Sequence, residues 1–153
     1  YGEIYGLETI GLRFPMVYGP EVRRGRAGFI SDLAASLLRN EGQVSTPPFD
    51  QPLNWGYVDD IADAIARALG VPASAQHAYT LAGFEATVEE TINMVLEMVP
   101  GSKNVAVEGA ARSRLQSQFD GSSARVELGW EARVTLQEGI SRIVEHYRGT
   151  PRV

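Results

Sequence analysis

The stretch LRFPMVYGP, residues 12–20, constrains the fold most, because a buried-strand pattern runs directly into a sharp turn. Apolar Leu12 and Phe14, with apolar Ile10 before them, leave little room for a solvated face, as expected of a parallel strand covered on both sides. Pro15 then removes a backbone donor, and Gly19-Pro20 turns the chain. Ligands of open α/β sheets bind outside the carboxyl ends of the strands. We therefore predict a buried strand and a ligand-side loop, at Thr9–Phe14 and Pro15–Pro20.

The remaining sequence alternates between short apolar segments and amphipathic helices. Thr87 with Glu90, and Thr135 with Glu138, have the spacing of capping boxes at the start of a helix. Further extended segments are expected at Gln43–Thr46, Trp55–Val58, Ala78–Leu81 and Asn104–Val107. Helices are expected at Phe29–Arg39, from a cap at Asp59 or Asp60 to Gly70, at Val88–Val99, at Ser122–Leu128 and after Thr135.

Composition excludes several classes of protein. The net charge of −5, from 14 basic and 19 acidic residues, argues against nucleic acid or an anionic membrane as a partner. No apolar run is long enough for a transmembrane helix. The absence of cysteine excludes disulfides, thiol catalysis and Cys-zinc sites, and it suits a reducing compartment. We predict a cytoplasmic protein that binds a small molecule, with a homodimer open as its assembly.

Four motifs occur in the order found in one enzyme family. The first stretch resembles R-x-x-N-V-Y-G-P, and Trp55–Leu69 resembles F-V-x-V-D-D-x-A-x-A. His77–Gly83 resembles V-Y-N-L-G, and Phe119–Arg148 resembles a segment with D-x-S-K-A, LGW-x-P and SLEEG. By these motifs the chain resembles the C-terminal half of an extended short-chain dehydrogenase/reductase, the NAD(P)-dependent epimerase/dehydratase family. The opening residues, Tyr1–Leu7, resemble the end of the helix that carries the family's Tyr-x-x-x-Lys pair.

The resemblance implies an α/β fold: the C-terminal part of a doubly wound Rossmann-type parallel sheet plus a small α/β substrate domain. Residues 1–153 would form the C-terminal fragment of one unit. The last Rossmann elements are expected at roughly 1–20 and 71–100, and the substrate-domain elements at roughly 21–70 and 101–153. The strands at Thr9–Phe14 and Ala78–Leu81 are expected to pair in parallel. The chain has no G-x-G-x-x-G turn for a pyrophosphate, so NAD or NADP is expected in the complete protein but not bound tightly by this chain alone.

The resemblance places Phe14, Pro15 and Met16 beside the nicotinamide, where a proline carbonyl and an apolar wall suit the ring. An equally weighted interpretation is a strand end packed in the core. Tyr18 is expected either to contact substrate through its hydroxyl or only to anchor the loop. No catalytic residue and no metal ligand is assigned within the chain.

Two positions depart from the family pattern at the substrate. Met16 stands where the family has an amide that holds substrate, and a thioether cannot donate a hydrogen bond. Leu53 stands where the sugar-nucleotide epimerases have a phosphate-binding Arg. Both departures predict a substrate less polar or smaller than a nucleotide sugar. The loop arginines could still bind a carboxylate or phosphate, although a solvated loop is the commoner meaning of such a run; they are Arg23, Arg24 and Arg26.

Three function classes follow. The favoured one is the substrate-binding part of an NAD(P)-dependent oxidoreductase, epimerase or dehydratase that acts on a sugar-like or hydroxyl/carbonyl substrate and is inactive alone. The second is a non-catalytic, nucleotide-binding regulatory relative. The third is an independent small α/β binding module. The adjacent pair Asp59-Asp60 invites an acid/base role, but its place at a helix start favours capping.

Overall fold

The structure, a computed structural model, describes residues 2–6, 9–22, 25–71, 78–101, 103–110 and 118–149. This part of the chain has the α/β fold that the sequence predicts. Its helices are α1 (Gly2–Tyr5), α2 (Gly28–Arg39), α3 (Val58–Ala68), α4 (Val88–Met98), α5 (Ser122–Glu127) and α6 (Leu136–Gly149). Its strands are β1 (Gly11–Arg13), β2 (Met16–Tyr18), β3 (Gly42–Thr46), β4 (Pro52–Tyr57), β5 (Ala78–Thr80), β6 (Phe84–Thr87) and β7 (Val105–Gly109).

The strands form three small sheets. β1 pairs in parallel with β5, with Gly11 opposite Ala78, which confirms the predicted parallel pair. β3 pairs in parallel with β7. The third sheet has the order β2-β4-β6, with β4 parallel to β2 and antiparallel to β6. The parallel partners lie far apart in sequence, as expected when helices connect them.

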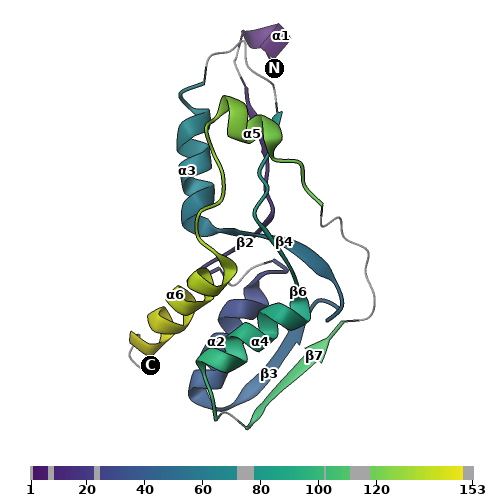
Figure 1. Cartoon of the computed structure of the whole chain (residues 1–153), viewed down its shortest axis with the longest axis vertical. Coiled ribbons are helices and arrows are strands. Elements are labelled where there is room, and N and C mark those ends of the chain that lie inside the picture. Colours follow the sequence, from purple (N-terminus) through teal and green to yellow (C-terminus); the bar gives the residue numbers. More distant parts are fainter. Residues whose placement is uncertain are drawn as a thin grey trace.

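Two apolar clusters occupy opposite ends of an elongated molecule (Figure 1). The larger cluster joins α2, α4 and α6 to β4, and it contains the fully buried Trp55. The smaller cluster joins α3 and α5 to β1 and β5 around Tyr79 and Trp130. The paths from β4 into α3 and from β5 into β6 connect the two ends.

The clusters distribute two helices differently from the predicted division. The division placed residues 58–68 with the substrate elements and residues 88–98 with the Rossmann elements. Ile61 and Ala64 of α3 instead pack with β5 and α5, whereas Val88 and Val95 of α4 pack with α2 and α6. The reason is that each helix starts just beyond the end of the third sheet, where the chain crosses from one cluster to the other.

Three other sequence-based expectations need correction. The loop predicted over Pro15–Pro20 contains β2, because the break at Phe14–Pro15 shifts the chain from pairing with β5 to pairing with β4. No strand was predicted at Phe84–Thr87, where the structure has β6. The predicted cap at Asp59 or Asp60 is wrong: α3 follows Tyr57, and no side chain caps it. The capping box of Thr87 and Glu90 is confirmed.

Candidate functional site

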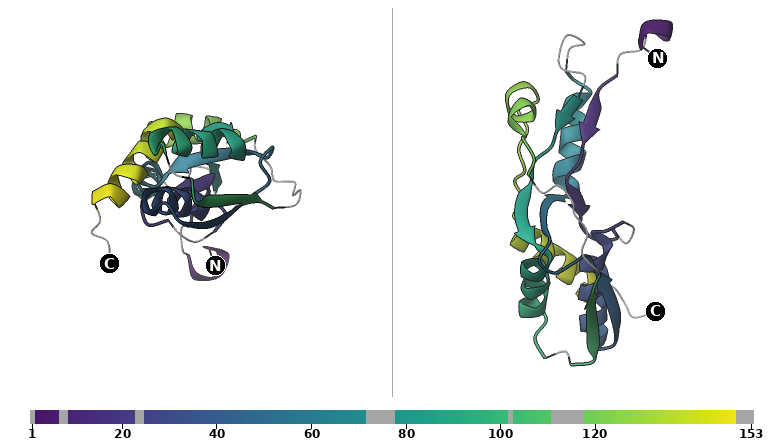
Figure 2. Two further views of the ribbon diagram at one scale, coloured as in Figure 1. Left: turned by 90° about the horizontal axis from the view of Figure 1, so that it is seen from below. Right: turned by 90° about the vertical axis from the view of Figure 1, so that its right-hand side faces the viewer.

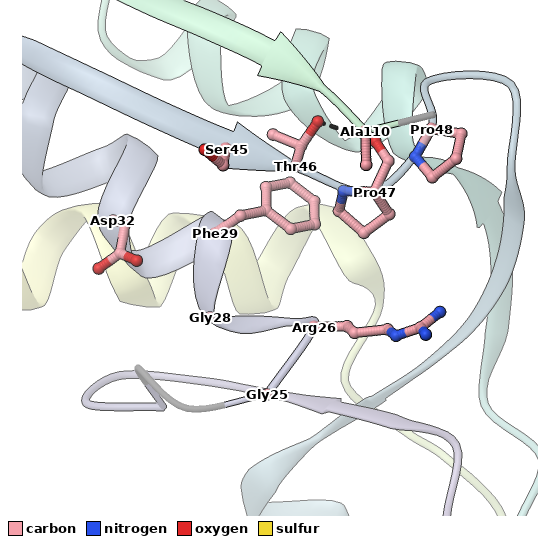
Figure 3. Close-up of a pocket in the computed structure, with 10 residues that line it drawn as sticks. All are labelled: Gly25, Arg26, Gly28, Phe29, Asp32, Ser45, Thr46, Pro47, Pro48 and Ala110. Atoms are coloured by element: carbon pink, nitrogen blue, oxygen red, sulfur yellow. Dashed lines mark hydrogen bonds between the residues drawn. The ribbon is translucent and has the colours of Figure 1, made fainter. Parts of the chain in front are cut away.

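A pocket of about 370 Å³ lies at the carboxyl ends of the parallel strands β3 and β7. The loop before α2 and the first turns of α2 form its other wall (Figure 3). Ligands of parallel sheets bind at such strand ends. The residues that line the pocket are Gly25, Arg26, Gly28, Phe29, Asp32, Ser45, Thr46, Pro47, Pro48 and Ala110.

Backbone and side-chain hydrogen bonds fix the strand end of this pocket. The amide of Ala110 donates to the carbonyl of Thr46 at 2.9 Å, which continues the β3–β7 ladder to the pocket. The Thr46 hydroxyl donates to the carbonyl of Pro47 at 2.9 Å and lies 3.5 Å from that of Glu108. An added Cβ at Gly109 would lie 3.1 Å from the ring of Phe49, a tight contact, so a larger residue would require that ring to shift. Hydrogen bonds therefore hold the backbone that forms this wall of the pocket.

The glycine-rich loop forms the opposite wall. Gly25 has a φ of 77°, a conformation that other residues rarely adopt, and the amide of Gly28 donates to its carbonyl at 3.3 Å. Phe29 forms the apolar floor; its ring lies edge-on to Trp55, with 6.0 Å between the centroids. This loop therefore places an apolar surface between two groups of opposite charge, the exposed side chains of Arg26 and Asp32 (Figure 3).

Of the predicted substrate residues, Arg26 lines this pocket, and Arg23 and Arg24 lie outside the described residues. Tyr18 and Leu53 lie in the larger core cluster, each only 1% exposed. The Tyr18 hydroxyl donates to the carbonyl of Thr135 at 3.2 Å. Contact of Tyr18 or Leu53 with a substrate therefore stays a prediction, and it would require the surrounding core to open.

The predicted nicotinamide residues lie where β1 gives way to β2. Phe14 is 44% exposed, Pro15 is buried, and Met16 packs partly buried against the larger cluster. Gly56 is required opposite them, because an added Cβ would lie 2.6 Å from Cγ of Pro15. The exposed Phe14 ring suits one apolar wall of a nicotinamide site, and contact of Phe14, Pro15 and Met16 with the cofactor stays a prediction.

Sequence reasoning missed most of the pocket. Phe29 and Thr46 were interpreted as helix and strand residues only, and Ala110 was not considered. The signal available was the pair of glycines, Gly25 and Gly28, directly before a helix, together with a polar residue at the end of a strand. Pairing of β3 with β7, which brings these segments together, is not visible in the local pattern.

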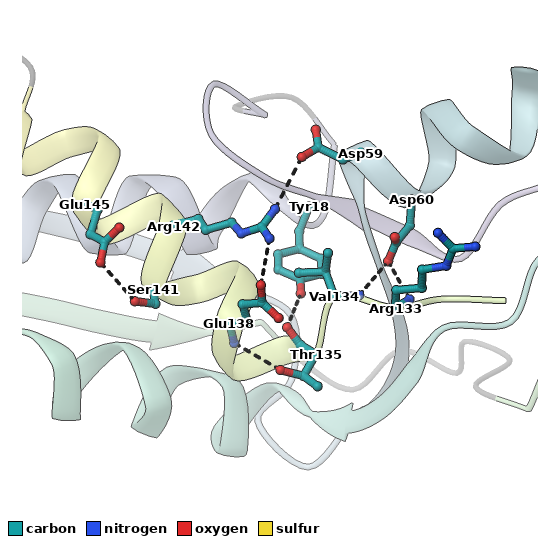
Figure 4. A network of polar contacts seen from close by, with 10 residues as sticks. All are labelled: Tyr18, Asp59, Asp60, Arg133, Val134, Thr135, Glu138, Ser141, Arg142 and Glu145. Carbon is teal, nitrogen blue, oxygen red and sulfur yellow. Dashed lines mark hydrogen bonds and ion pairs between the residues drawn. The ribbon is translucent and has the colours of Figure 1, made fainter.

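A polar network joins α6 to the start of α3 (Figure 4). The Arg142 guanidinium lies between the carboxylates of Glu138 at 2.7 Å and Asp59 at 3.4 Å. It also lies 5.2 Å from the centroid of the Tyr57 ring. Burial raises the pKa of both Tyr18 and Tyr57. Both phenols are therefore neutral at physiological pH, and the network has a structural role.

Asp60 forms the second part of this network. Its carboxylate accepts hydrogen bonds from the amides of Arg133 and Val134, both at 2.9 Å, and its carbonyl accepts one from the Trp130 indole at 2.8 Å. These bonds fix the segment between α5 and α6 to the start of α3. In contrast, the side chain of Asp59 is 69% exposed.

The family model described as "NAD dependent epimerase/dehydratase family" matches residues 1–82. The chain belongs to this family. It is 27% identical over 150 residues to UDP-glucose 4-epimerase of Mycolicibacterium smegmatis, covering 97% of this chain and 48% of the relative. The chain thus spans about half the length of the curated relatives it matches.

Solved structures show the same fold. UDP-glucose 4-epimerase of Thermus thermophilus, in complex with NAD, is 28% identical with a TM-score of 0.78, covering 99% of this chain and 50% of that one. A partial-consensus L-threonine 3-dehydrogenase, 21% identical, has a TM-score of 0.82 and covers 98% of this chain and 52% of that one; it is evidence for the fold alone. No helix in the described ranges is long and apolar enough to cross a membrane.

Proposed function

We propose that this chain supplies the substrate-side part of an NAD(P)-dependent epimerase, dehydratase or related oxidoreductase that acts on a hydroxyl or carbonyl group of a sugar-like small molecule. The observation that supports this most is the pocket of about 370 Å³ at the carboxyl ends of β3 and β7, in a chain that belongs to the NAD dependent epimerase/dehydratase family.

Each side of the pocket has a role in this proposal. The Arg26 guanidinium binds an anionic group of the substrate through charge-assisted hydrogen bonds. Phe29, Pro47 and Pro48 cover an apolar portion, and the Ser45 hydroxyl is placed to bond a polar group. Phe14, Pro15 and Met16 would hold the nicotinamide, which supplies the hydride acceptor when bound. No residue of this chain is assigned as a proton-transfer group.

Two substrate classes compete. Met16 and Leu53, in place of an amide and a guanidinium, favour an unphosphorylated sugar or a carboxylated or acyl substrate. Loss of a donor from a buried polar site costs roughly 1–3 kcal/mol. The second candidate is a UDP-sugar, because the relatives at 27% and 28% identity are UDP-glucose 4-epimerases. In that case the arginine loop, rather than position 53, would bind the phosphates.

The test uses the chain joined to its nucleotide-binding part, with NAD⁺ and NADP⁺ and a panel of alcohols, hydroxy acids, sugars and UDP-sugars. We expect turnover of an unphosphorylated or carboxylated substrate. Efficient turnover of a UDP-sugar would select the second candidate. Cofactor binding without turnover of any panel member would instead favour a regulatory relative, and no cofactor binding would favour an independent binding module.

The Arg26→Ala variant tests the pocket itself. We expect KM for an anionic substrate to rise about tenfold with kcat little changed, because the lost contact binds a group remote from the reacting atoms. Arg39→Ala is the matched control, since Arg39 lies at the far end of α2 and pairs loosely with Glu41 at 3.9 Å. An equal effect of both variants would show that Arg26 acts only through general surface charge.

A further inference from the structure

The turn Gly19–Val22 leads from β2 toward the glycine-rich wall of the pocket, and Arg26 follows Val22 by four positions. The carbonyl of Gly19 accepts hydrogen bonds from the amide of Val22 at 3.2 Å and from the hydroxyl of Ser31, a buried residue of α2, at 3.1 Å. The first bond closes the turn, and the second fixes its first residue to α2. The turn therefore sets the direction in which the chain approaches the pocket wall.

Glu21, inside this turn, combines an unfavourable backbone conformation with a distant partner. Its φ of 63° lies in the left-handed region, and it follows Pro20 at a turn position where Gly or Asn is the usual residue. Such a conformation persists where surrounding contacts determine it. One such contact is with α6, because Oε1 of Glu21 lies 2.9 Å from Nε2 of His146. α6 packs beside α2 and α4 at the end of the molecule that contains the larger cluster, so the contact connects the turn to a well-packed helix (Figure 2).

The charge of His146 decides how strong this contact is. Histidine side chains change charge between pH 5 and 8, whereas glutamate side chains are ionised across this range. His146 lies in the last turn of α6, where the helix dipole favours a cation, and the Glu21 carboxylate favours the same charge. A neutral imidazole can still donate from Nε2, but a charge-assisted hydrogen bond is about twice as strong. The contact is therefore strongest at the acidic end of the range and weakens as the pH rises.

Other charged groups lie on the elements around His146. In the described part of the chain, the charged and titratable side chains of the turn, of β2, of α6 and of the elements packed against α6 are Tyr18, Glu21, Asp32, Arg39, Tyr57, Glu89, Glu90, Glu97, Glu138, Arg142, Glu145, Tyr147 and Arg148. Arg142, one helical turn before His146, lies between the two carboxylates of the network in Figure 4. Arg148 donates to the carbonyl of Met98 at 2.7 Å. Of the carboxylates in this set, Glu21 makes the ion-pair contact with the imidazole, so substitutions at Glu21 and His146 test that contact directly.

We propose that Glu21 and His146 form a pH-sensitive tether of the substrate pocket. When His146 is protonated, the tether holds the turn Gly19–Val22 on α6 and so positions the pocket wall that carries Arg26. When His146 is neutral, this wall is held less firmly, and the pocket binds an anion more weakly. The effect on anion binding rests on the proposed function, which assigns Arg26 to an anionic group of the substrate. The tether itself rests on the contact between Glu21 and His146.

The experiment measures the protection of the Val22 amide from hydrogen exchange at about pH 5.5 and about pH 8, relative to the amides of α4 and corrected for the chemical effect of pH. We expect protection to fall about two- to fivefold at the higher pH, the range for a partly exposed ion pair. His146→Lys should keep the high value at both pH values, because its charge is permanent. Glu21→Gln should give the low value at both. Glu145→Gln is the matched control, since it removes a carboxylate next to His146 in sequence and leaves the tether in place.

Sulfate provides the probe of the pocket, because its charge does not change across this pH range. Amide chemical shifts near Arg26 follow its binding. We expect sulfate to bind about two- to fivefold more tightly at the lower pH in the unmodified protein and in Glu145→Gln, and equally at both pH values in Glu21→Gln. Unchanged protection of α4 in every variant shows that the chain remains folded.

The outcomes are separable. Equal protection of Val22 at both pH values in the unmodified protein overturns the proposal. So does a pH dependence that survives in Glu21→Gln, or low protection of His146→Lys at the higher pH. Sulfate affinity near Arg26 that ignores pH while Val22 responds also overturns it, because the tether would then not reach the pocket. A pH response of Val22 without sulfate binding near Arg26 at either pH would support the tether and refute the anion-binding role that the proposed function gives to Arg26.

Discussion

Two adjacent aspartates have different roles because they project in different directions from α3. The Asp60 carboxylate is buried and accepts two backbone amides from the segment before α6. The Asp59 carboxylate is exposed and meets Arg142 at 3.4 Å. Exposed pairs contribute little to stability, whereas buried amides without an acceptor are costly. The sequence predicted the pair correctly as structural but assigned the wrong partner.

Replacement of these residues should separate the two roles. Asp60→Ala should lower the free energy of unfolding by about 2–3 kcal/mol, because the amides of Arg133 and Val134 lose their acceptor. Asp59→Ala should change it by less than about 1 kcal/mol. Urea unfolding of both variants provides the measurement. Similar losses would mean that the bonds to the α6 segment do not stabilise the fold.

Tyr18 links stability to alkaline pH. Burial raises its pKa above the ordinary value of 10.0, so the unfolded chain ionises this phenol before the folded chain does. Its contribution is therefore fully present below pH 10 and is lost as the pH rises toward the folded pKa. Tyr18→Phe should cost about 1 kcal/mol at pH 7, through the bond to Thr135, and should reduce the decline in stability above pH 10. Unfolding curves of both proteins at pH 7 and above pH 10 test this. An equal loss of unfolding free energy above pH 10 in the variant and the unmodified protein would contradict it.

At the scale of elements, α6 contains two glycines in opposite environments. An added Cβ at Gly139 would lie 2.7 Å from two carbons of the Tyr18 ring, whereas Gly149 has open space around it. Gly139 therefore lets α6 pack closely on β2. This contact explains why a residue with poor helix propensity lies inside a buried helix face.

Gly139→Ala should destabilise the protein by about 1–3 kcal/mol, since the buried ring of Tyr18 cannot move without disturbing its neighbours. Gly149→Ala should be neutral or slightly stabilising, because alanine favours the helix and meets nothing. Thermal unfolding monitored by circular dichroism distinguishes them. A stabilising effect at both positions would show that the α6–β2 contact is looser than described.

Helices were predicted more accurately than strands, for physical reasons. Thr87 with Glu90 is a capping box of two local hydrogen bonds, which a four-residue pattern specifies completely. β2 and β6 depend on β4, which pairs with both of them from other parts of the sequence. β2 also follows a proline, which normally argues against a strand. Long-range pairing overrides the local signal in both cases.

At the scale of the whole molecule, the candidate site was only partly predictable. Arg26 was predicted because a run of arginines in a loop is a candidate anion site. The pocket is also lined by Ser45 and Ala110, which pairing of β3 with β7 brings to the same place. Leu53 was selected from a motif position, and a motif does not reveal that a side chain is 1% exposed. A family motif predicts which sequence position has a role, whereas the exposure of its side chain depends on how all three sheets pack.

We expect the isolated chain to bind NAD(H) weakly or not at all and to have no dehydrogenase, epimerase or dehydratase activity. Phe14, Pro15 and Met16 offer a wall for the nicotinamide but no phosphate ligands, and the sequence has no glycine-rich turn. Calorimetric titration with NAD(H) tests this, with the chain joined to its nucleotide-binding part as the positive control. Micromolar affinity of the isolated chain would show that it contains its own cofactor site.

Two of the parallel ladders have a kinetic consequence. Gly11 pairs with Ala78, and Gly42 pairs with Val105, so each ladder closes a long loop before its contacts stabilise it. Proteins dominated by such distant pairings have high contact order and fold slowly, in milliseconds to seconds. During synthesis, β1 leaves the ribosome well before β5 and remains an unpaired strand in the interval. The parallel pairing of strands that are distant in sequence thus also exposes the nascent chain to aggregation.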